Sequence, residues 1–326
     1  MSLPLPQSLT PSKVSAFKDC ALAFRFSAID HLPEPPSPPA VKGTLVHRAL
    51  EGLYWSVPPG QRTLEAGHAQ LALAWDDMRE DPEWLALGLD EEGAGAMLAD
   101  AGRLVDRYFA MEDPETVRAI GTELVVEATI GSLLLRGIID RLDLDAGGRL
   151  VVTDYKTGKV PGAAQEQARL GGVHFYAYLC ERALGVRPAE VRLLYLRDQV
   201  VISTVPSEQS TRGLVMRTRA LWSAVERACR LEDFRPKPSA LCDWCAFRAW
   251  CPAFGGDPAL ARAEAEAGLG PGFGGDPAMA QAALHPGAAG ESPPLPGLGC
   301  APLPAGGASV GAGGASVGAG PLSVPA

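Results

Sequence analysis

The sequence predicts a folded region in the α/β or α+β class, with helices before and after a group of strands. Between Glu123 and Lys156, short runs rich in β-branched residues alternate with Gly-containing turns, a pattern typical of antiparallel hairpins. On both sides of this stretch, apolar residues recur at helical spacing. The predicted order is helices, sheet, helix, strands and helix, followed by a Cys-rich end at residues 241–251.

The region before the strands is predicted to be helical. It begins with a polar, helix-starting stretch, SLTPSKVSAFKDC, passes through the Pro-rich HLPEPPSPP and enters GTLVHRALEGLYW. In that last piece apolar residues share one helical face, and His47 lies off it. Two more amphipathic helices are expected between about residues 63 and 111, as a scaffold or a lid. The shared face of the first helix consists of Leu45, Val46, Ala49, Leu50 and Leu53.

The strands and the elements after them follow from the same periodicities. The runs ELVVEATI, LLLRGIIDRLDLD and RLVVTDYK predict a three-stranded meander. The elements expected next are a helix at about 164–184, strands at 191–196 and 200–205, and a helix at about 208–230.

Composition separates a folded part, residues 1–254, from a tail, residues 255–326. The tail is mostly Gly, Ala, Pro and Ser and contains GGASVGAGGASVGAG, so we expect it to be disordered. Part of the net charge of −9 lies in the tail, which leaves the folded part only mildly acidic. This balance counts against a protein that coats nucleic acid through a broad basic surface, but not against an enzyme with one local DNA groove.

Targeting signals and membrane spans are absent from the pattern. No apolar run approaches the roughly 18 to 20 residues that span a bilayer, and MSLPLPQSLTPSK lacks the apolar core of a signal peptide. We therefore expect a cytoplasmic protein without membrane contact. Its seven cysteines are then reduced, and clusters among them indicate metal binding or catalysis before disulfides.

Two carboxylates and a lysine are predicted to meet at one edge of the sheet. Asp140 ends one apolar run, and Asp154 and Lys156 end the next, where the spacing Asp-x-Lys puts both side chains on one strand face. Such a group suits phosphodiester hydrolysis with Mg²⁺ or Mn²⁺ on the carboxylates and the ammonium beside the phosphate. For an isolated Asp-x-Lys, the alternative is a pair of ordinary solvated residues.

Three cysteines close the folded part, in the spacing Cys242-x2-Cys245-x5-Cys251. With a fourth thiolate they would bind Zn²⁺ or an iron–sulfur cluster. Cys20 is the best fourth ligand, because it follows the first helix and would tie the start of the chain to its end. The other choices are Cys180, which lies in an apolar helix, Cys229, and Cys300, which lies in the tail.

Four features together resemble a known family: SLTPSKVSAFKDC, GTLVH, GIIDRLD followed by DYKTGK, and C-x2-C-x5-C. The set resembles RecB-family exonucleases of the PD-(D/E)XK nuclease superfamily, in the iron–sulfur branch shared by AddB-type nuclease domains and CRISPR-adaptation nucleases. The resemblance covers about residues 8–252. It implies an α/β, restriction-endonuclease-like core with a central mixed sheet flanked by helices, a helical insertion at about 61–115, and a Cys cluster closing the N- and C-terminal parts.

The resemblance also implies roles for individual residues. His47, Asp140 and Asp154 would be metal ligands together with the carbonyl of Tyr155, and Lys156 would be the catalytic lysine. Cys20, Cys242, Cys245 and Cys251 would hold a [4Fe–4S] cluster. The family usually has a Q-x-x-x-Y motif on the helix after the active strand; here Tyr176 fits the Tyr, and Gly172 stands at the Gln position. Tyr176 would contact DNA or support the metal ligands.

The hypothesis from the sequence is a metal-dependent DNA nuclease, an exonuclease acting on single-stranded ends in repair or recombination. The chain lacks G-x-x-x-x-G-K-[ST], so a helicase partner would be a separate chain. Two alternatives remain. One is a catalytically weak DNA-binding or repair-complex module that keeps the fold and the cluster, and the other is a zinc-stapled structural protein in which Asp-x-Lys is incidental.

Overall fold

The computed structural model describes residues 2–162 and 166–267. None of the helices in these ranges is both long enough and apolar enough to cross a membrane. The elements before the sheet are α1 (Pro11–Asp19), α2 (Ala21–Ala28), α3 (Pro38–Trp55), α4 (Leu64–Met78), α5 (Pro82–Leu85) and α6 (Glu91–Met111). Those that follow are β1 (Arg118–Ile130), β2 (Leu133–Leu144), β3 (Leu150–Lys156), α7 (Glu166–Ala183), β4 (Glu190–Tyr195), β5 (Val200–Thr204), α8 (Glu208–Leu231) and α9 (Ala261–Glu266).

The described strands form a five-stranded mixed sheet in the order β1-β2-β3-β4-β5. β1, β2 and β3 are the predicted antiparallel meander, which the structure confirms. Gly131 and Gly148 take positive φ values of 65° and 74° in its two turns, where a side chain would be strained. β3 pairs with β4 in parallel, which requires a long crossover, and α7 supplies it. β5 then returns antiparallel to β4.

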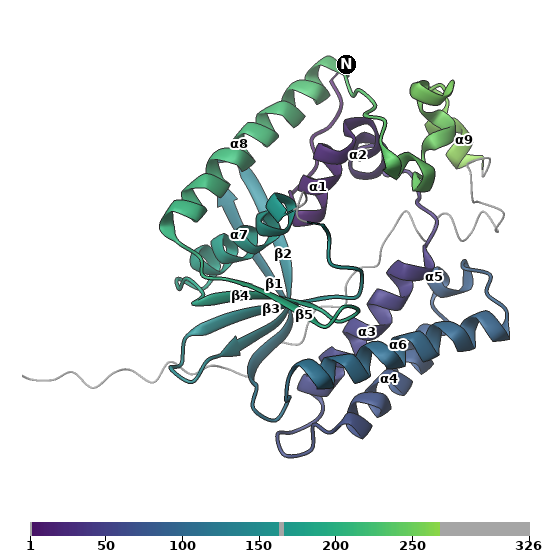
Figure 1. The fold of residues 1–326 in the computed structure, drawn as a ribbon. Helices are drawn as coiled ribbons and strands as arrows, with labels where there is room; N and C mark the ends of the chain where they lie inside the picture. Colours follow the sequence, from purple (N-terminus) through teal and green to yellow (C-terminus); the bar gives the residue numbers. More distant parts are fainter. Residues whose placement is uncertain (1, 163–165, 268–326) are drawn as a thin grey trace, which may run out of the picture. The chain divides into compact units, whose positions relative to one another are not determined.

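Two hydrophobic cores lie on the sheet. One joins β1–β4 to α1, α2, α7 and α8, and the other packs α3, α4 and α6 against Tyr155, Leu194 and Leu196 (Figure 1). The expected insertion therefore contains three helices rather than two, since the short α5 lies between α4 and α6. The expectation of a central mixed sheet flanked by helices is confirmed.

Four of the helices begin directly after a short polar residue that caps the first turn. The side chains of Thr10, Thr63, Asp90 and Ser207 accept hydrogen bonds from the first turns of α1, α4, α6 and α8. These bonds satisfy amide groups that have no partner inside the helix. The helix starts are therefore set locally, before packing on the sheet.

The start of the chain lies against its late elements. Leu3 N–H donates to the carbonyl of Cys229 at 3.1 Å, and Lys237 Nζ donates to the carbonyl of Lys18 at 2.8 Å. Leu9 forms a parallel bridge to Leu135 of β2. The N-terminal segment is thus held by residues that are more than 100 positions away in the sequence.

The ordered C-terminal part continues past residue 254, where the sequence analysis placed the start of the tail. Short 3-10 helices between Ala240 and Phe254 lead to α9, whose Ala261 and Ala265 are buried against the larger core. Trp250 Nε1 donates to Glu264 Oε2 at 2.7 Å. The high alanine content of this segment led to the prediction of disorder. Alanine also favours helices and is small enough to pack closely against a core, which explains why α9 forms here. Residues 268–326 of the expected tail lie outside the described residues.

Candidate active site

Asp140, Asp154 and Lys156 come together where β2 and β3 lie side by side. The residues Asp140 and Asp154 are 8% and 2% exposed, although both are acidic. The backbone N–H of Tyr155 donates to Asp140 Oδ2 at 2.7 Å, which ties the two strands at this point. The ammonium of Lys156 forms an ion pair with the Asp154 carboxylate. The structure therefore brings together the three groups that the Asp-x-Lys pattern singled out.

His47 reaches this cluster from α3. The apolar face of α3 is buried, and the imidazole off that face lies with Nδ1 3.6 Å from Asp140 Oδ2. Its ring meets the ring of Tyr155 edge-on, with centroids 5.9 Å apart. The helix thus brings His47 next to Asp140 in β2.

Glu123 of β1 is a member of the cluster that sequence reasoning missed. Its Oε1 lies 3.9 Å from His47 Nδ1, and ligand atoms of His47, Glu123 and Asp140 all lie within 4.8 Å of one another. Nitrogen and carboxylate oxygen donors at this spacing fit a hard divalent ion such as Mg²⁺ or Mn²⁺. The only signal in the sequence is an acidic residue at the start of an apolar run, which is common in strands without a function.

The crowded carboxylates change the proton affinities of the cluster. Burial, with the charge of Asp154, raises the pKa of Asp140 to about 7. Burial opposes the charged form of Lys156, but the Asp154 carboxylate offsets this and raises the Lys156 pKa. The His47 pKa is also raised, because Glu123 and Asp140 more than offset the effect of burial. The cluster therefore has an excess of negative charge that a cation would stabilise.

A cavity of about 500 Å³ opens beside His47 and Glu123. Thr44, Arg48, Glu51 and Thr157 also line it. Gly43 allows the close approach of α3 to the end of β3, because a Cβ at this position would lie 3.2 Å from Thr157 Oγ1. Burial and the charge of Glu123 raise the pKa of Glu51 in this cavity. The cavity gives a ligand access to the carboxylates.

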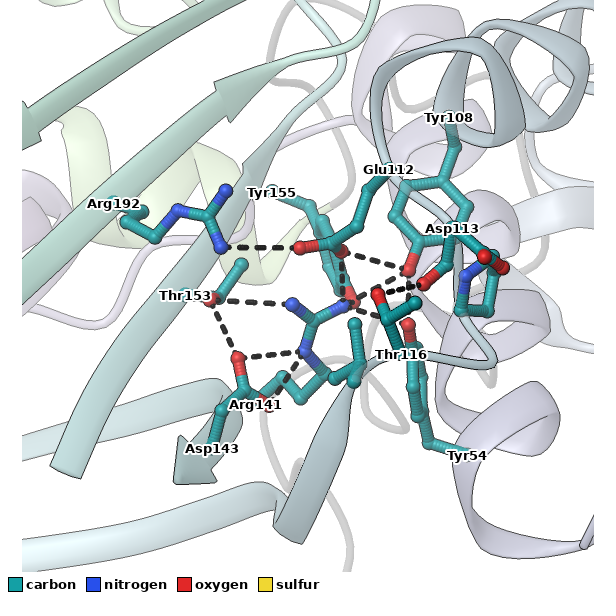
Figure 2. Close-up of polar contacts among 12 residues, drawn as sticks. Tyr54, Tyr108, Glu112, Asp113, Thr116, Arg141, Asp143, Thr153, Tyr155 and Arg192 are labelled. Atoms are coloured by element: carbon teal, nitrogen blue, oxygen red, sulfur yellow. Dashed lines mark hydrogen bonds and ion pairs between the residues drawn. The ribbon is translucent and has the colours of Figure 1, made fainter. Parts of the chain in front are cut away.

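A buried arginine, Arg141, lies at the centre of a network of hydrogen bonds and ion pairs (Figure 2). Arg141, next to Asp140 in the sequence, is 0% exposed, and its Nη1 donates to Glu112 Oε2 at 2.7 Å. Its Nε donates to Asp143 Oδ1 at 2.8 Å. Nη1 also lies 2.9 Å from three tyrosine hydroxyls, those of Tyr54 on α3, Tyr108 on α6 and Tyr155 on β3.

This arginine network connects the elements that carry the cluster. α3 holds His47, β2 holds Asp140, and β3 holds Asp154 and Lys156. A charged residue inside an apolar strand ordinarily faces solvent, so no local pattern indicates that Arg141 is buried. The network fixes the positions of the helices on the sheet and, through them, of the site residues.

Tyr176 of α7 lies beside the carboxylates on the sheet. Burial raises its pKa, and the charges of Asp154 and Asp140 raise it further. A Cβ at Gly137 would lie 3.2 Å from the Tyr176 ring. At Gly172, a Cβ would lie more than 4 Å from the described neighbouring residues, which leaves room on that side for a longer side chain.

The four cysteines of the expected cluster line one cavity of about 320 Å³. Cys20 lies at the junction of α1 and α2, and Cys242, Cys245 and Cys251 lie on the 3-10 helices near the end of the described chain. Burial raises the pKa of Cys245, and the other three thiols add to this effect. Of the remaining cysteines, Cys180 is buried in the core, Cys229 donates to the carbonyl of Pro4, and Cys300 lies outside the described residues.

The fold and this geometry agree with the comparison with known families. Residues 8–252 match the family model of the PD-(D/E)XK nuclease superfamily. The chain belongs to this superfamily. PD-(D/E)XK nucleases use divalent metal ions, and the imidazole and carboxylate donors of the cluster fit such ions.

Two solved structures are similar to this PD-(D/E)XK chain. A candidate exonuclease from Eubacterium rectale has 10% sequence identity and a TM-score of 0.48, and the match covers 73% of this chain and 87% of the other. The protein SSO0001 has 15% identity and a TM-score of 0.31, with coverages of 65% and 84%. No curated protein matches this chain. The superfamily assignment rests on the family match.

Proposed function

We propose that this chain is a metal-dependent DNA nuclease that hydrolyses phosphodiester bonds. The observation that carries the proposal is the convergence of His47, Asp140, Asp154 and Lys156, where the end of β3 lies beside the middle of β2 and next to an open cavity. Phosphodiester hydrolysis needs a cation near the phosphate and a positive group for the charge that develops on its oxygens. The imidazole and carboxylates of this set supply the ligands for the cation, and the Lys156 ammonium is the positive group.

The residues of the site have distinct roles in this proposal. His47, Asp140, Asp154 and the Tyr155 carbonyl would hold a Mg²⁺ or Mn²⁺ ion, which supplies charge to the phosphate and makes water more acidic. Lys156 stays protonated at neutral pH because its pKa is raised, so it acts as a hydrogen-bond donor to a phosphate oxygen rather than as a base. The Asp154 carboxylate, paired with the ammonium, orients it.

We further propose an exonuclease of the RecB type that acts on single-stranded DNA ends in repair or recombination. The support is the set of motifs in their order along the chain, GTLVH, GIIDRLD, DYKTGK and the split cysteines. The mildly acidic folded part favours binding of DNA in one local groove over coating of long DNA. Unwinding would come from a separate helicase partner, because the sequence carries no nucleotide-binding P-loop motif.

We also propose a [4Fe–4S] cluster on Cys20, Cys242, Cys245 and Cys251. The support is that all four thiols line one cavity and that four thiolates are a usual ligand set of such a cluster. The cluster's role would be structural, because it would join α2 to the 3-10 helices at the end of the nuclease fold.

The test of the nuclease is cleavage of end-labelled single- and double-stranded DNA by anaerobically purified protein with Mn²⁺ or Mg²⁺. We expect cleavage by the parent, and loss of cleavage in Asp154→Asn and Lys156→Met. Asp106→Asn is the matched control, because this carboxylate is half-exposed on α6 and lies outside the cluster. Cleavage that survives in both site variants would refute the assignment.

A second candidate function is a DNA-binding module with weak activity. Gly172 favours it, because the family has Gln at this position. Binding of DNA without cleavage by a metal-loaded parent would support the module. Since none of the described neighbouring residues lies within 4 Å of a Cβ at Gly172, Gly172→Gln is then expected to fold and to gain cleavage if the missing amide is the cause.

A further inference from the structure

An apolar groove of about 520 Å³ lies between α4 and α6, two helices that pack on α3 (Figure 1). The residues that line it recur three or four positions apart on each helix, so one face of each helix forms a wall. On α6 they span positions 95–102, which makes the groove about two helical turns, or roughly 10 Å, long. Its walls include Leu71, Ala72 and Trp75 of α4 and Gly95, Leu98 and Ala99 of α6.

Trp75 gives the groove an aromatic wall in a fixed position. Its ring meets the ring of Trp84 edge-on, with centroids 4.5 Å apart, and Trp84 is buried in the core of these helices. Trp75 and Leu98 also pack on this core while they line the groove. Rigid aromatic side chains of this kind are enriched among the residues that contribute most to protein–protein binding. The groove is therefore preformed for apolar side chains.

The helices around the groove carry most of the chain's net charge. Residues 64–111, from the start of α4 to the end of α6, contain 11 acidic residues, three arginines and no lysine, which gives a charge of −8. The whole chain has a charge of −9. The arginine that lines the groove, Arg103, is paired with Asp100 at 2.9 Å. The surface around the groove is thus strongly acidic, whereas the rest of the chain is nearly neutral.

Three exposed carboxylates lie beside the residues that line the groove. Asp76 follows Ala72 by one turn on α4, and Glu91 and Glu92 lie one turn before the lining residues of α6. The two glutamates also stabilise the start of α6, but Asp76 lies in the last turn of α4, where a carboxylate opposes the helix dipole. Its ion pair with Arg79, at 3.8 Å, is exposed and weak. Helix stability therefore does not account for Asp76.

The acidic surroundings decide what can occupy the groove. DNA and an anionic membrane would be repelled by them. A second copy of the chain would bring two such acidic surfaces together, because a two-fold interface uses the same patch on both subunits. Residues 268–326 contain two acidic residues and neither lysine nor arginine, so this segment has no complementary charge. The complementary occupant is a basic segment of another protein.

We propose that this groove binds a basic amphipathic helix of a partner protein. Apolar residues of the partner helix at i, i+3, i+4 and i+7 fill the groove between Trp75 and Leu98. Lysines or arginines on its flanks pair with Asp76, Glu91 and Glu92, which orient it. The partner helix completes a layer with α4 and α6. This surface is separate from the proposed nuclease site, and the proposal does not rest on that function.

The test is the binding of a labelled synthetic helix to the full-length, anaerobically purified protein, measured by fluorescence anisotropy. The probe is a peptide of about 20 residues with leucines at i, i+3, i+4 and i+7 and lysines on its other faces. We expect saturable binding by the parent. Ala99→Trp, at an exposed position, fills the groove and is expected to raise the Kd at least about tenfold. Gly95→Trp is a second groove variant, because a Cβ there has no described neighbour within 4 Å.

A charge variant separates the acidic rim from the apolar groove. Glu91→Gln with Glu92→Gln should raise the Kd at least about threefold. Glu226→Gln with Glu266→Gln is the matched control, since it makes the same change in net charge on α8 and α9, and its Kd should equal that of the parent. Melting temperatures equal to that of the parent show that the variants are folded.

Four outcomes would overturn the proposal. They are no binding by the parent, an unchanged Kd in both groove variants, and equal binding of a peptide with the same composition but scattered leucines, since charge alone would then explain it. The fourth is a parent that sediments as a dimer while Ala99→Trp sediments as a monomer, which would assign the groove to a second copy. None of these readouts depends on whether the chain cleaves DNA.

Discussion

Replacing Arg141 with Met is expected to destabilise the fold by about 3–5 kcal/mol. The guanidinium donates to Glu112 and Asp143, whose side chains are only 8% and 7% exposed. Met roughly fills the space of the arginine stem but carries no charge, so two buried carboxylates lose their partner. Arg192 remains 3.1 Å from Glu112 and partly offsets the loss at that carboxylate.

Urea denaturation of the parent and the variant measures this cost, and the melting temperature should fall by about 6–20 °C for a domain of this size. Arg136→Met is the matched control on the same strand. Its side chain is half-exposed, so a change below about 1 kcal/mol is expected. Arg141→Met combined with Asp143→Leu should regain part of the loss, because one unpaired charge is removed. A cost for Arg141→Met below about 1 kcal/mol would refute the view that this network joins α3 and α6 to the sheet.

Three further predictions concern protons, cysteines and the end of the fold. The pKa of Asp140 in the folded state is raised to about 7, so the protonated carboxyl group stabilises the fold at pH 4, and this stabilisation is lost as the pH rises through 7. The metal-free parent should therefore lose stability over this pH range relative to Asp140→Asn. Equal pH slopes in urea denaturation would contradict this. Cys20→Ser should lose iron as fully as Cys245→Ser, whereas Cys180→Ser should keep it, by iron analysis after anaerobic purification. Full iron content in the first variant would overturn the ligand set. Truncation after Gly256 removes α9 and should lower the melting temperature, whereas truncation after residue 267 should not; equal melting temperatures would show that α9 adds no stability.

The elements that could be predicted are those set by local pattern. The meander follows from β-branched runs and glycine turns, and the two long helices α3 and α8 follow from apolar spacing. Asp140, Asp154 and Lys156 were found because strand alternation and one hairpin are enough to bring them together. His47 could be assigned to the site only through the family resemblance. For a histidine off the apolar face of a helix, the local sequence does not show which residues it will contact.

The parts that could not be predicted depend on contacts between distant segments. Glu123 joins the site only because its backbone takes a left-handed turn opposite β2, and no residue type signals that turn. Arg141 is buried only because tyrosines from α3, α6 and β3 converge on it. α9 was missed for a different reason, because alanine counts toward disorder in a composition but packs well on a helix.

The neighbouring positions of the first and last described segments have a consequence for biosynthesis. Leu3 bonds to Cys229, and Cys20 shares its cavity with residues beyond 240. A ribosome must therefore complete most of the chain before α1 and α2 can reach their final places. Contacts of such large sequence separation slow folding. The nascent protein thus passes through a period in which its N-terminal helices lack their packing partners, and the proposed cluster could form only after Cys251 has been synthesised.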